Sequence, residues 1–166
     1  DLTYYGLQHY GERKLADLLR NLSDVEGIDW IRMQYAYPSQ FPMEVFDVMN
    51  ERENICKYLD MPLQHVSDNM LKSMRRGISK RRTIELVDQI RQRVPDIALR
   101  TTLIAGHPGE TDQDFQELYD WVEETRSERL GIFTYSHEEG TRAYAETDDC
   151  RRAFILRYFG EEVTSR

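Results

Sequence analysis

The sequence lacks the features that mark membrane, secreted and metal-binding proteins. It has no run of about 18 apolar residues and no signal peptide, which predicts a soluble, cytoplasmic protein without a membrane partner. Its two cysteines, Cys56 and Cys150, are far apart in the sequence and match no metal-ligand or redox spacing. We therefore expect one reduced core thiol and one surface thiol, and we assign no metal-binding residue.

Phosphate-binding motifs are also missing. There is no Gly-Lys-Ser/Thr ending of a P-loop and no Gly-x-Gly-x-x-Gly of a dinucleotide fold. The formal charge is -8, and contacts to nucleic-acid phosphates need clustered Lys and Arg, so nucleic acid is an unlikely partner. The one dense basic stretch spans residues 75–82 and is most simply the solvated end of one helix and the start of the next.

The apolar residues predict helices that alternate with strands. The length of 166 residues and the hydrophobic fraction of 40% suit one globular domain. Apolar spacing predicts helices at 12–22, 42–50 and 112–125, two more capped by Ser67 and Thr83, and strands at 30–37, 55–61, 98–105 and 130–135. Strands separated by helical crossovers pair in parallel, which predicts an α/β fold. Four strands cannot close an eight-stranded barrel of about 250 residues, so we expect an arc of a barrel or half of an open sheet.

Four unusual stretches follow the four predicted strands: AYPSQ, MPLQH, GHPGET and YSHEEGT. The carboxyl ends of parallel strands share one face, so these stretches predict one composite ligand site. The alternative is that Gly and Pro simply punctuate the strand ends.

The stretch GHPGET has the features of a turn whose backbone a ligand can approach closely. Gly106 and Gly109 allow positive φ or a close ligand, and Pro108 stiffens the turn. Thr111 and Asp114 resemble a capping box that starts the next helix, with Asp in the usual Glu or Gln place.

The start of that helix is acidic, which restricts the ligand. Bare N–H groups at a helix N-terminus attract anions, but Glu110, Asp112 and Asp114 would repel one. We therefore expect a ligand with ribose hydroxyls, an adenine edge or a positive centre.

Three polar residues on the strands are further candidates. Arg100 lies in an apolar strand, where an unpaired cation is costly, so it should meet a protein or ligand carboxylate. Gln64 and His65 end a strand together, and His65 is either a hydrogen-bonded core residue or a ligand contact. The adjacent Glu138 and Glu139 point opposite ways on an extended segment, so they are more suited to loop hydrogen bonds or a basic partner.

The strand-end stretches resemble one family. In order, DLTYYG, WIRMQYAYP, KYLDMPLQH with LKSMRRG, RTTLIAGHPGET and FTYSHEEGT are similar to the radical S-adenosylmethionine methylthiotransferases over residues 1–149. The similarity is greatest to the RimO-type branch, which methylthiolates an aspartate of small-subunit ribosomal protein twelve. MPLQH, Arg100-Thr101-Thr102 and SHEEGT each favour this branch over the relatives that modify transfer RNA.

The resemblance implies a partial (β/α)6 barrel of parallel strands, a TIM-like fragment of a radical SAM domain. It implies S-adenosylmethionine as cofactor and a [4Fe-4S] cluster on a Cys-x-x-x-Cys-x-x-Cys loop, which cleaves the cofactor to a radical that takes hydrogen from the aspartate β-carbon. That loop is absent from this sequence. We therefore expect residues 1–149 to be part of the barrel without its cluster-binding first βα unit, residues 150–166 to be a helical tail, and the chain alone to be inactive.

The resemblance also implies which residues face the cofactor. The adenosine side is expected at Thr102, Gly106, Pro108 and Gly109, and the neighbouring strand is expected to contribute Gln64 and His65. Arg100 would meet the cofactor carboxylate or an internal acid, and Tyr135 and Ser136 would close the far edge. No catalytic residue is assigned.

Three alternatives remain open at this stage. The first is a transfer-RNA methylthiotransferase of the same family. The second is an unrelated TIM-barrel enzyme for a sugar or phosphate ligand, which the acidic helix start disfavours. The third is a truncated, non-catalytic domain that binds protein through its sheet face and the loop at 138–140.

Overall fold

The computed structural model describes residues 1–136. The chain divides into two compact units, Asp1–Thr134 and Tyr135–Arg166. Cys150, the Glu138–Glu139 pair and the expected tail helix lie outside the described residues. No helix in the described part of the chain is long and apolar enough to cross a membrane.

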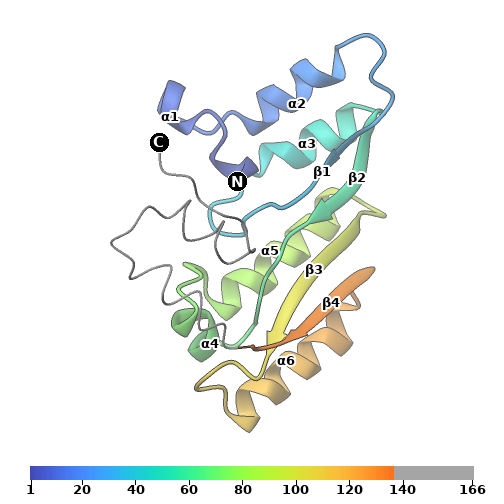
Figure 1. Ribbon diagram of the computed structural model, residues 1–166. Helices are drawn as coiled ribbons and strands as arrows, with labels where there is room; N and C mark the ends of the chain where they lie inside the picture. The colour runs from blue at the N-terminus through green and yellow to red at the C-terminus, as the bar shows by residue number, and fades with distance from the viewer. Residues whose placement is uncertain (137–166) are drawn as a thin grey trace, which may run out of the picture. The chain divides into compact units, whose positions relative to one another are not determined.

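The first unit is a parallel sheet with helical crossovers (Figure 1). Its four strands are hydrogen-bonded in sequence order, β1-β2-β3-β4, and every pairing is parallel. The elements are η1 (Leu2–Tyr4), α1 (Leu7–Tyr10), α2 (Leu15–Ser23), β1 (Ile31–Met33), α3 (Glu44–Glu51), β2 (Ile55–Asp60), α4 (Asp68–Ser73), α5 (Lys80–Arg93), β3 (Ala98–Ala105), α6 (Asp112–Thr125) and β4 (Arg129–Thr134). The predicted α/β class and the barrel-like order of strands are confirmed.

The core lies between the sheet and helices α3, α5 and α6, which run along one side of it (Figure 1). Helix α3 buries Val45, Phe46, Val48 and Met49 because these positions share one side of the helix. On β3, Leu99 and Leu103 are buried against the helices. The alternate positions of β3 therefore point to the opposite face, which we call the inner face of the sheet.

Register determines which side chains share the inner face. Arg100, Thr102 and Ile104 of β3 are opposite Arg129, Gly131 and Phe133 of β4, and Asp60 of β2 is opposite Arg100. Side chains at paired positions of parallel strands point the same way, so all seven lie on the inner face.

Two local predictions were wrong. Ser79, not Thr83, is the N-cap of α5: its hydroxyl accepts from the Arg82 N–H, whereas Thr83 is buried one turn later and donates to the Ser79 carbonyl. Strand β1 covers only Ile31–Met33 and not 30–37. The helical turns η1 and α1 at residues 2–10 were not predicted.

Candidate cofactor-binding site at the strand ends

Three successive strands are followed by a residue with a left-handed backbone. After β1 it is Tyr35 with φ 61°, after β2 it is Gln64 with φ 72°, and after β3 it is Gly106 with φ 79°. Only glycine adopts this conformation without strain, so Tyr35 and Gln64 each cost about 1 kcal/mol or more. Such strain in a non-glycine residue is typical of functional positions, because a side chain is retained there at an energetic cost.

Tyr35 lies just beyond the end of β1, where the sequence predicted that the strand would continue. Met33 is opposite Leu59, and beyond Tyr35 the chain rejoins β2 where the Ala36 N–H donates to the Asp60 carbonyl. The ring of Tyr35 is half exposed and borders a hollow of about 600 Å³ that is also lined by Tyr4, Tyr5 and Tyr10.

The MPLQH stretch extends the sheet beyond β2. The Gln64 N–H donates to the Thr102 carbonyl, and its own carbonyl accepts from the Ile104 N–H. The buried Thr101 hydroxyl donates to the Met61 carbonyl and accepts from the Leu63 N–H. These bonds fix Gln64 beside the end of β3.

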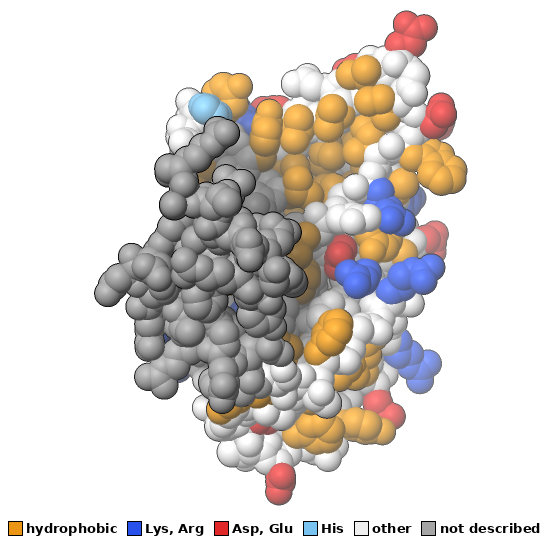
Figure 2. All heavy atoms as spheres, viewed as in Figure 1, with side chains coloured by type: hydrophobic (Ala, Val, Ile, Leu, Met, Phe, Trp, Pro, Cys, Tyr) orange, Lys and Arg blue, Asp and Glu red, His pale blue; other side chains and the backbone are white. Residues whose placement is uncertain are grey.

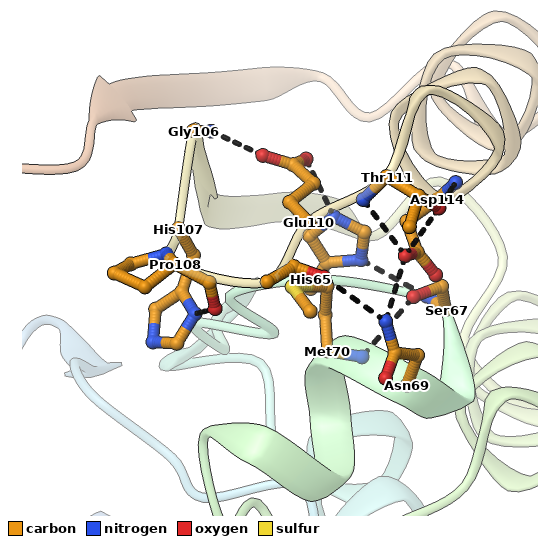
Figure 3. Close-up of polar contacts among 11 residues, drawn as sticks. His65, Ser67, Asn69, Met70, Gly106, His107, Pro108, Glu110, Thr111 and Asp114 are labelled. Carbon is orange, nitrogen blue, oxygen red and sulfur yellow. Dashed lines mark hydrogen bonds and ion pairs between the residues drawn. The ribbon is translucent and has the colours of Figure 1, made fainter.

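Glu110 closes the GHPGET turn from inside (Figure 3). Its carboxylate accepts from the Gly106 N–H with one oxygen and contacts His65 Nε2 at 3.1 Å with the other. His65 Nδ1 accepts from the Ser67 N–H, so Nε2 carries the hydrogen that is donated to Glu110. The Glu110 side chain is only 6% exposed. It therefore holds the turn and does not repel a ligand at the surface, which corrects the prediction for this residue.

His65 has a different position from the one expected. It is fully buried and both ring nitrogens are engaged within the protein, so it acts on the turn through Glu110 and does not offer its ring to a ligand. Of the two alternatives that the sequence left open, the geometry matches the hydrogen-bonded core histidine.

Asp114 ties α6 to α4 (Figure 3). The predicted capping box is confirmed: Thr111 Oγ1 accepts from the Asp114 N–H, and the Asp114 carboxylate accepts from the Thr111 N–H. The same carboxylate accepts from Asn69 Nδ2 at 2.8 Å. Hydrogen bonds from the hydroxyls of Ser67 and Thr111, and from Asn69, hold the pKa of Asp114 well below its usual value.

Asp114→Asn is expected to lower the free energy of unfolding by about 1–2 kcal/mol at neutral pH, because a helix cap and a charged acceptor are lost. A lowered pKa contributes stability that is present above the unfolded value of about 3.9 and is lost as pH falls through the folded value. The difference between wild type and variant should therefore shrink below about pH 4. Urea unfolding at pH 7 and pH 3 measures it, and an equal difference at both values would contradict the assignment.

The inner face beside the turn is partly apolar. Ile104 and Phe133 are neighbours across β3 and β4, and the ring of Phe133 is 62% exposed. Thr102 is half-buried opposite Gly131, and a Cβ at Gly131 would lie 3.8 Å from the Thr102 hydroxyl oxygen. This surface suits a flat ring with polar groups at its edge.

Arg100 is paired with an internal acid. Its Nη1 lies 2.7 Å from Asp60 Oδ2, across the β2–β3 pairing. Arg100 shares the inner face with Thr102, but it precedes Gly106 by six residues, or about 20 Å at 3.3 Å per residue. It therefore lies apart from the turn, and the sequence alone could not identify Asp60 as its partner.

The predicted residues fall into three groups. Gln64, Thr102, Gly106, Pro108 and Gly109 gather at the ends of β2 and β3. His65 is buried, and Arg100 lies near the start of β3. Tyr135 and Ser136 belong to the second unit, so their role stays a prediction. Among residues 1–136, no group of three or more His, Cys, Asp or Glu could hold a metal ion.

Comparison with known proteins identifies the family. A family model for the Radical SAM superfamily matches residues 4–122, most of the described sheet. The chain belongs to the radical SAM superfamily. Two solved structures support the fold alone because their sequence identity to this chain is low. Coproporphyrinogen III oxidase (HemN) from Escherichia coli has a TM-score of 0.56 and 22% identity, and the match covers 75% of this chain and 28% of that one. Streptococcus suis SuiB bound to precursor peptide SuiA has a TM-score of 0.51 and 14% identity, over 88% of this chain and 32% of that one.

Curated relatives with highly similar sequences share one name. The protein named ribosomal protein uS12 methylthiotransferase RimO in Cytophaga hutchinsonii is 66% identical over 148 residues, which are 89% of this chain and 34% of the relative. Its namesake in Chloroherpeton thalassium is 57% identical over 169 aligned positions, 98% of this chain and 39% of the relative. The predicted resemblance is confirmed. The chain spans little more than a third of the length of these relatives.

A second family model, RecQ zinc-binding, matches residues 112–166. This match covers less than half of the chain and overlaps α6 and β4 of the radical SAM sheet. The matched stretch contains one cysteine, Cys150, and one histidine, His137. It shows no family.

Proposed function

We propose that this chain supplies the S-adenosylmethionine-facing wall of a methylthiotransferase that modifies the β-carbon of an aspartate in ribosomal protein uS12. The observation that carries the proposal is the 66% identity, over 89% of the chain, to an enzyme named for that activity. Methylthiolation is assigned to the whole protein, because most of the length of the relatives lies outside the match. We propose that the chain by itself binds the cofactor without turnover.

The residues at the strand ends fit the adenosyl part of this cofactor. Gly106 is exposed, and a Cβ built there would meet nothing within 4 Å, so the backbone is open to a ligand. Thr102 offers a hydroxyl beside the apolar surface of Ile104 and Phe133, and the backbone of Gln64 is hydrogen-bonded to the same end of β3. When bound, the cofactor supplies the radical chemistry of the superfamily; the residues of this chain hold and orient it.

The turn suits a cationic, phosphate-free ligand. Glu110 directs its carboxylate into the protein, but Asp112 remains exposed in the first turn of α6. A phosphate would be repelled there, whereas a sulfonium or an ammonium group would not. The acidic start of α6 therefore favours a ligand with a positive centre over a phosphate, as the sequence predicts.

The experiment is a comparison of substrates. The full-length enzyme, with its clusters and S-adenosylmethionine, is incubated separately with ribosomal protein uS12 and with a transfer-RNA anticodon arm. Mass spectrometry should find the methylthio mass on the aspartate of uS12 and none on the RNA. A gain on the RNA alone would place the chain in the transfer-RNA branch and overturn the proposal.

A further inference from the structure

The inner face of the sheet carries four charged side chains, which we call the inner charge cluster: Arg32, Asp60, Arg100 and Arg129. Arg100 is opposite Asp60 on one side and Arg129 on the other. The guanidinium carbon of Arg32 lies 4.9 Å from the ring centroid of Tyr58, two residues before Asp60 on the same face. Figure 2 shows basic side chains gathered around an acidic one on this side of the molecule.

Asp60 is incompletely satisfied. Its side chain is 10% exposed, and one carboxylate oxygen accepts from Arg100. The other oxygen, Oδ1, is buried and has no hydrogen-bond partner within the described residues. A buried acceptor without a donor is costly, so a ligand N–H that reached Oδ1 would be favoured.

The arginines have unused donors. Arg100 uses Nη1 for Asp60, and its side chain is 43% exposed. Within residues 1–136, Arg129 and Arg32 make no ion pair with an acidic side chain. The cluster therefore has an excess of two positive charges. Guanidinium groups bind carboxylates in a paired, planar geometry, so this excess suits a carboxylate ligand.

We propose that the inner charge cluster recognises an aspartyl residue of a peptide: its side-chain carboxylate binds Arg100 and Arg129, and its backbone N–H donates to Asp60 Oδ1. The assignment rests on the proposed function, since it names the residues that select that enzyme's target side chain. A nucleic-acid phosphate meets only half of the requirement, because a phosphate diester has no N–H for Asp60. The methionyl end of S-adenosylmethionine has the same combination of carboxylate and N–H, so the experiment separates the two sources.

The test uses the 166-residue chain labelled with ¹⁵N. The guanidinium Nε–H signals of Arg100 and Arg129 are followed by NMR during titration with a capped peptide that contains one aspartate. The same peptide with asparagine, and S-adenosylmethionine alone, are titrated in parallel. The aspartyl peptide should shift both signals, and the asparaginyl peptide should bind at least about tenfold more weakly because a charge-assisted bond is lost.

Arg129→Gln is the deciding variant, because Arg129 holds no ion pair in the described part and its loss should leave the fold intact. This variant should weaken binding of the aspartyl peptide about tenfold or more. Arg81→Gln, an 81% exposed side chain on α5, is the matched control and should bind like wild type. Equal binding of both peptides, no effect of Arg129→Gln, or shifts caused by S-adenosylmethionine and not by the peptide would each overturn the inference. If one of these results is found while the full-length enzyme still methylthiolates uS12, only this inference has failed. If the full-length enzyme adds the methylthio group to RNA instead, the proposed function is rejected as well.

Discussion

Gly106→Val is expected to weaken binding of S-adenosylmethionine roughly 100-fold and to leave the fold in place. Because nothing lies within 4 Å of a Cβ at this position, the protein has room for the new side chain. The left-handed φ of 79° adds strain of about 1–2 kcal/mol. The valine occupies the space that the ligand needs, and losing about 3 kcal/mol of contacts weakens affinity roughly 100-fold. Titration calorimetry measures the loss.

Gly27→Val is the matched control for this prediction. Gly27 has a φ of 84° and also has nothing within 4 Å of its Cβ position, so the strain is the same. It lies in the connection before β1, away from the strand ends. This variant should bind S-adenosylmethionine like wild type. Identical heats from wild type and Gly106→Val would remove Gly106 from the cofactor wall.

Glu110→Ala is expected to destabilise the chain by about 2–4 kcal/mol, because two hydrogen bonds to a buried carboxylate are lost together. The variant leaves the His65 Nε2–H without its acceptor at a fully buried site and releases the Gly106 N–H. Urea unfolding measures the free energy, and faster hydrogen exchange at the Gly106 amide should accompany the loss.

Glu117→Ala provides the comparison for Glu110→Ala. Glu117 makes an ion pair with Lys80 at 2.8 Å, but both side chains are about one-third exposed. Such surface pairs contribute about 0–1 kcal/mol. If the two alanine variants were equally stable, Glu110 would not be holding the turn.

Local sequence patterns predicted the elements around the site well. The bounds predicted for β3 and α6 agree with the structure at both ends, because eight consecutive strand residues and a capping box leave little choice. The position of Arg100 in an apolar strand also predicted a carboxylate partner, and in the structure that partner is Asp60. These results depend on neighbours in sequence or on a general burial penalty.

What the sequence could not reveal depends on contacts between distant segments. Glu110 meets His65 across 45 residues, and the local sequence alone predicts a solvent-facing charge for its carboxylate. Asp60 and Arg100 are 40 residues apart, and only the β2–β3 register joins them. The left-handed backbone of Tyr35 follows the early end of β1 at Met33, whereas the apolar pattern of residues 30–37 predicts an unbroken strand.

The most direct measurement follows the backbone amides of the ¹⁵N-labelled chain while S-adenosylmethionine is added. If the ends of β2 and β3 form one cofactor wall, the largest shifts should fall on Gln64, Thr102 and Gly106 to Glu110, and Gly106→Val should remove them. Shifts centred on the tyrosine-lined hollow beside Tyr35, with Gly106 unchanged, would contradict the account.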